Sequence, residues 1–93
     1  MSSRADRITA VLRQTFNPAR LEVVDDSARH AGHAGHAPEG QTHYLVLMVA
    51  DSFRGQSRLE RSRAVHAALA GEFASGLHAL NLTLRTPEEQ EKA

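Results

Sequence analysis

Cysteine is absent from this chain of 93 residues. Its absence excludes disulfide bonds, cysteine nucleophiles and thiolate metal ligands supplied by the chain itself. No apolar run reaches the length of about eighteen residues that a membrane-spanning helix needs, so we expect no membrane contact. The N-terminus has no apolar stretch behind a basic start, which predicts no secretory signal. Together these absences predict a cytoplasmic protein.

Aromatic side chains and net charge are also scarce. Aromatic residues make up 4% of the chain, which argues against a surface on which nucleic-acid bases stack. Eleven basic and eleven acidic side chains balance, so the overall charge gives no support to nucleic-acid binding. The sequence contains no phosphate-binding loop, nucleophile elbow or metal-hydrolase motif, and we therefore predict that the chain is not an enzyme.

Histidine, in contrast, is frequent, with six residues. Three of them form the repeat His30-Ala-Gly-His33-Ala-Gly-His36, inside a glycine-rich segment that we expect to be a loop over about residues 26–42. The repeat is compatible with a low-complexity insertion. It is also compatible with adventitious binding of Zn²⁺, Ni²⁺ or Cu²⁺, since clustered imidazoles suit those metals.

Apolar periodicity predicts the other elements. A first helix begins after Ser3, where Asp6 completes a capping box, and ends at Asn17-Pro18. Strands are predicted at 21–25, 44–50 and 78–84 from their alternating or continuous apolar residues. The first helix is expected to carry one apolar stripe, composed of Ile8, Val11, Leu12, Thr15 and Phe16.

A second helix is predicted from a capping box at Ser57 and Glu60 to Ser75-Gly76, where glycine suits a left-handed cap. We expect its solvent side to include Arg58, Arg61 and Glu72. A last short helix begins after Thr86, with Pro87 at its first position, and the tail 90–93 is expected to fray.

The predicted order is helix, strand, strand, helix, strand, helix, in one domain over residues 1–93. Helices on one face of a three-stranded sheet predict an α+β two-layer sandwich. We expect the first two strands to be antiparallel neighbours joined by the histidine loop.

Six segments, in order, resemble the BolA family. The resemblance covers roughly residues 4–90 and implies the fold of a type II KH domain. It also implies a partnership with a monothiol glutaredoxin that shares a 2Fe–2S cluster, in iron–sulfur and iron homeostasis. A second implied activity is DNA binding in transcriptional regulation of stress response and cell morphology. The segments are Leu21-Glu-Val-Val-Asp-Asp-Ser27, His43-Tyr44, Ser52-Phe-Arg-Gly55, Arg61-Ser-Arg63-Ala-Val65, Gly76-Leu-His78-Ala-Leu80 and Thr86-Pro-Glu-Glu89.

The resemblance implies histidine ligands for the cluster. The family's histidine in the Gly-x-His-Ala-Leu segment falls on His78, and a second ligand would come from the loop. There His36 is slightly favoured over His30, and His33 remains an alternative. His43 is a weaker candidate, because a polar residue is common just before a buried strand. Without a cysteine in this chain, the other ligands would be thiolates of a glutaredoxin cysteine and a bound glutathione.

The DNA-binding alternative depends on four arginines around the turn and the start of the second helix. They predict a basic patch that contacts phosphates together with the helix N-terminus. A solvated helix face, with Glu60 as a pairing partner, is the alternative interpretation. The turn has one glycine, so the G-x-x-G backbone clamp of KH domains is missing. Ser62 also stands where the BolA family usually has a histidine. The arginines are Arg54, Arg58, Arg61 and Arg63.

Overall fold

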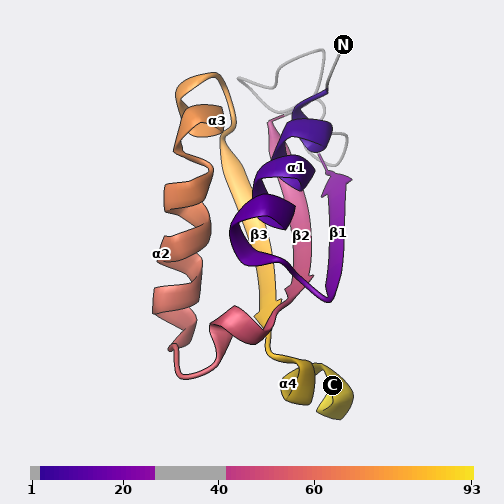
Figure 1. Cartoon of the computed structure of the whole chain (residues 1–93). Coiled ribbons are helices and arrows are strands. Elements are labelled where there is room, and N and C mark those ends of the chain that lie inside the picture. The colour runs from indigo at the N-terminus through magenta and orange to yellow at the C-terminus, as the bar shows by residue number, and fades with distance from the viewer. Residues whose placement is uncertain (1–2, 27–41) are drawn as a thin grey trace.

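The structure is a computed structural model that describes residues 3–26 and 42–93. Its described part holds three strands that form one sheet, with helices before, between and after them (Figure 1). The elements in chain order are α1 (Arg4–Phe16), β1 (Arg20–Asp25), β2 (His43–Val49), the 3-10 helix η2 (Asp51–Phe53), α2 (Arg58–Ala68), α3 (Ala70–Ala74), β3 (Ala79–Arg85) and α4 (Pro87–Lys92).

The sheet has the strand order β1-β2-β3. Strand β1 runs antiparallel to β2, with Leu21 opposite Met48, which confirms the predicted hairpin partners. Strand β3 runs parallel to β2, with Tyr44 opposite Leu80. Helices α1, α2 and α3 lie over the same face of the sheet (Figure 1). The predicted two-layer α+β sandwich is therefore confirmed.

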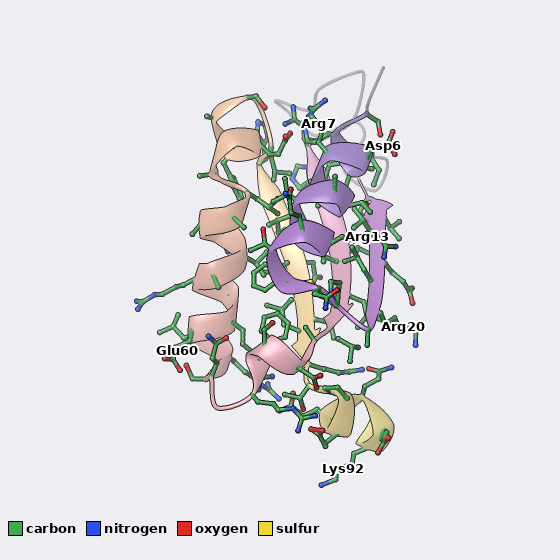
Figure 2. All side chains as sticks on the ribbon, in the orientation of Figure 1. Asp6, Arg7, Arg13, Arg20, Glu60 and Lys92 are labelled. Carbon is green, nitrogen blue, oxygen red and sulfur yellow. The ribbon has the colours of Figure 1, made fainter. Side chains whose placement is uncertain are left out.

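The core lies between this sheet face and the helices. Successive side chains of a strand point to opposite faces, and in β2 the alternate residues Tyr44, Val46 and Met48 are buried. Leu45 and Leu47, on the opposite face of β2, are half-buried. Charged side chains such as Glu60 and Lys92 point away from the layers (Figure 2). The buried cluster is completed by Ile8, Leu12, Ala50, Phe53, Val65, Leu69 and Leu77.

The ends of the helices follow local sequence signals. Capping boxes are present at Ser3 and Ser57, as predicted. Thr86 caps α4 as expected and also forms a capping box with Glu89. Gly76 has a φ of 125°, a conformation that side chains with a Cβ rarely adopt, and it ends the helical segment before β3.

Four expectations were wrong. The predicted second helix is interrupted at Leu69, which separates α2 from α3. Thr15 is exposed and does not belong to the apolar stripe of α1. The tail does not fray from residue 90, because α4 continues to Lys92. Arg61 and Glu72 are not on the solvent side: Arg61 is 7% exposed and the Glu72 side chain 14% exposed.

Ion pairs between helices explain the error at Glu72. Its carboxylate accepts hydrogen bonds from Arg4 at 2.7 Å and from Arg7 at 3.0 Å, and so joins α3 to α1. The Arg4 guanidinium also donates to Ser75, to Oγ at 2.8 Å and to the carbonyl oxygen at 3.0 Å. Helical periodicity places polar residues outward by default and does not identify a partner on another helix.

Candidate functional site

Two of the candidate ligands, His43 and His78, lie at the same end of the sheet. His43 is the first residue of β2, and His78 directly precedes β3. The Thr42 carbonyl oxygen accepts from the backbone N–H of His78 at 2.8 Å and of Ala79 at 3.1 Å, which fixes the two strand starts side by side. The imidazole centroids are 5.9 Å apart, with the rings edge to face at 79°. We call His43 and His78 the histidine pair.

The two rings differ in their surroundings. His78 is exposed, whereas His43 is half-buried. The Thr42 hydroxyl lies 2.9 Å from Nδ1 of His43 and orients that ring through a hydrogen bond. Such an oriented imidazole beside an accessible one suits metal coordination, because a hydrogen bond at one ring nitrogen defines which nitrogen is available to the metal ion.

The histidine pair is an incomplete ligand set. In residues 3–26 and 42–93 there is no group of three His, Asp or Glu side chains placed to hold a metal ion. A metal centre here would therefore need ligands from outside this part of the chain. His30, His33 and His36 lie outside the described residues, so the ligand assignment within the loop stays a prediction.

From the sequence alone, His43 ranks below the loop histidines as a candidate ligand, and the structure places it beside His78. The pairing register sets His43 opposite Ala79, the residue next to His78. A histidine at the start of each of two strands was the available signal, but the parallel pairing that joins the starts is a tertiary feature.

The four arginines of the DNA-binding hypothesis do not form one free cationic patch. Arg54 pairs with Asp51 at 2.8 Å and also with Glu88 of α4. Arg61 is buried and pairs with Glu89 at 2.6 Å. Arg58 and Arg63 are exposed, and within the described ranges neither forms an ion pair.

Arg61 connects several elements at the end of the fold where α2 starts and β3 ends. Its guanidinium donates to the carbonyl oxygens of Gln56 at 3.1 Å and Leu84 at 3.2 Å. It also lies 5.7 Å from the ring centroid of Phe53. Hydrogen bonds from Arg61 and from the Thr86 backbone lower the pKa of Glu89 to about 2. Arg61 thus joins the start of α2, the end of β3 and the start of α4.

Several known proteins are similar to this chain in sequence. The sequence profile of the family described as BolA-like protein matches residues 12–89. SufE-like protein 1, chloroplastic/mitochondrial, from Arabidopsis thaliana is 42% identical over 96% of this chain, and the chain spans 25% of that protein. The DNA-binding transcriptional regulator BolA from Escherichia coli (strain K12) is 41% identical over 92% of this chain and 78% of its own length.

A solved structure shares the fold. The BolA domain of SufE1 from Arabidopsis thaliana is 40% identical and superposes with a TM-score of 0.85, over 96% of this chain and 98% of that chain. None of the helices in the described part is long and apolar enough to cross a membrane.

Proposed function

Because the chain belongs to the BolA-like protein family, we propose that it is an interaction module that docks on a monothiol glutaredoxin and shares a 2Fe–2S cluster with it. The role is non-catalytic and serves iron–sulfur and iron homeostasis. The observation that carries the proposal is the histidine pair, in which an exposed imidazole lies 5.9 Å from an oriented one.

The chemistry of the donors supports a shared centre. Imidazole nitrogens are established ligands of one iron in two-iron clusters, the other iron being held by thiolates. This chain has no cysteine, so it cannot supply those thiolates. A glutaredoxin cysteine and a bound glutathione would supply them. His78 is one proposed ligand, and the second is His43 or a histidine of the loop.

Anaerobic reconstitution tests this proposal. The protein is mixed with iron, sulfide and glutathione, with and without a monothiol glutaredoxin, and followed by visible absorption, circular dichroism and size exclusion. We expect a heterodimer whose spectrum differs from that of the glutaredoxin alone. His78→Ala should abolish this spectrum, and His43→Ala should alter it if His43 is the second ligand.

His66→Ala is the matched control, since His66 lies on α2 away from the pair, where its Nδ1 is 2.8 Å from the Ser62 carbonyl oxygen. This variant should keep the wild-type spectrum. A His78→Ala complex with unchanged absorption and circular dichroism would rule out His78 as a cluster ligand. Absence of any heterodimer would rule out the proposed complex with a monothiol glutaredoxin.

DNA binding is a second candidate function. Two observations favour it: the similar Escherichia coli protein is named a DNA-binding transcriptional regulator, and Arg58 and Arg63 are exposed on one helix. Binding of a labelled duplex should weaken with rising salt and in Arg63→Ala, because phosphate contacts release counterions. Salt-independent or undetectable binding would reject this candidate.

A further inference from the structure

A groove between α2 and β3 offers a binding surface separate from the histidine pair. Its volume is about 610 Å³, and neither His43 nor His78 lines it. It runs along β3, which is an edge strand of the described sheet and lies beside α2 (Figure 1). We call it the edge groove, and its lining includes Arg58, Ser62, His66, Leu80, Leu82 and Leu84.

The backbone along the edge groove is available for another strand. In a parallel pairing, alternate residues direct both of their amide groups to the same neighbouring strand. Ala79 donates to Thr42 at 3.1 Å and the Arg85 carbonyl oxygen accepts from Ala50 at 3.0 Å, so the odd-numbered residues face β2. Leu80 and Leu82 therefore direct their N–H and C=O groups to the open edge.

The side chains of the edge groove combine an apolar floor with positive charge. Leu80, Leu82 and Leu84 are half-buried and form the floor. Arg58 lies at one end, exposed and without an ion pair in the described part of the chain. Glu89, the one acidic residue of the described lining, is already paired with Arg61. The groove therefore favours a ligand that is negatively charged and partly apolar.

We propose that the edge groove binds an extended acidic segment of a partner protein, which adds a strand to β3. An extended segment presents every second side chain to the helix side of the sheet, where the leucines and α2 lie. Apolar residues on that side cover the leucines, and a carboxylate at the end of the same side pairs with Arg58. A nucleic acid fits less well. No Phe, Tyr or Trp lines the groove in the described residues, which leaves the His66 ring without a partner for a continuous stack of bases, and Arg61 is engaged internally.

A labelled peptide tests the proposal with the full chain. The probe is a fluorescein-labelled octapeptide, Glu-Ser-Val-Ser-Val-Ser-Glu-Ser, which places its valines and glutamates on the same side of an extended chain, and binding is measured by fluorescence anisotropy. We expect Arg58→Glu to weaken binding about fivefold to tenfold, because the ion pair is lost and a repulsion replaces it. Arg63→Glu on the same helix is the matched control and should bind as wild type, since Arg63 does not line the groove. The same peptide with lysine in place of both glutamates should not bind.

Amide hydrogen exchange gives a second readout that does not depend on charge. Strand addition should protect the N–H groups of Leu80 and Leu82 when the peptide is bound. Peptide binding without that protection overturns the strand-addition geometry, and equal losses in Arg58→Glu and Arg63→Glu overturn the groove as the site. If a single-stranded octanucleotide displaces the peptide and binds more tightly, the groove is a nucleic-acid site and the proposal fails. His78→Ala should retain peptide binding, which separates this result from the cluster experiment.

Discussion

Replacing Arg61 by Met separates a structural role of this arginine from a role on a DNA-binding surface. The change keeps an unbranched apolar stem beside Phe53 and removes every hydrogen-bond donor of the guanidinium. The carbonyl oxygens of Gln56 and Leu84 lose the donor at 3.1 and 3.2 Å. The residue is 7% exposed, so these carbonyl oxygens lose a charged donor in a largely buried setting.

The expected magnitude comes from the two carbonyl bonds. A hydrogen bond with one charged partner contributes about 1.5–3 kcal/mol to stability. Apolar packing of the methionine side chain offsets part of the stability lost with the two bonds. The ion pair with Glu89 adds little, because that carboxylate side chain is 48% exposed. We therefore expect Arg61→Met to lower the free energy of unfolding by about 2–4 kcal/mol, a large share of the stability of a small domain.

Urea unfolding followed by far-ultraviolet circular dichroism measures this loss. Arg63→Met is the matched control, since Arg63 is an exposed arginine of the same helix, and its stability should stay within about 0.5 kcal/mol of wild type. An Arg61→Met protein as stable as the control would refute the reasoning. That result would instead support the sequence-based expectation that Arg61 lies on the solvent side of α2.

Three further predictions concern stability. Glu72→Gln should cost about 1–3 kcal/mol in urea unfolding, because buried Arg4 loses its charged acceptor at 2.7 Å, whereas exposed Glu22→Gln should change little. Tyr44→Phe should be nearly neutral at pH 8, since the Tyr44 hydroxyl is buried without a hydrogen-bond partner among the described residues. Burial raises the pKa of Tyr44, so the unfolded chain ionises first and wild type should lose stability above about pH 10, a loss absent from the Phe variant. Because the pKa of Glu89 is lowered to about 2 from an ordinary 4.5, its contribution is full above pH 4.5 and is lost as the pH falls toward 2. Loosening of α4 over that range, seen in its amide resonances, checks this; a flat response would contradict it.

Local signals predicted most of the elements correctly. Capping boxes at Ser3, Ser57 and Thr86 satisfy backbone N–H groups within four residues, so they act independently of the rest of the fold. The continuous apolar run of β2 is similarly informative, because a strand with one face in the core and the other half-covered needs apolar residues at successive positions. The boundaries of the elements were predicted less accurately, as the interruption of the predicted second helix at Leu69 shows.

The amino-acid sequence by itself determined the order of elements, the family and the absence of thiolate ligands from this chain. Only the tertiary structure decided which polar side chains are engaged and which histidines meet. Arg61 and Arg63 are two residues apart, yet one is buried against β3 and α4 and the other faces solvent. His43 and His78 are distant in sequence and adjacent in space because β2 and β3 start side by side. Such pairings depend on contacts between segments far apart in the chain, and the identity of a residue does not encode its partner.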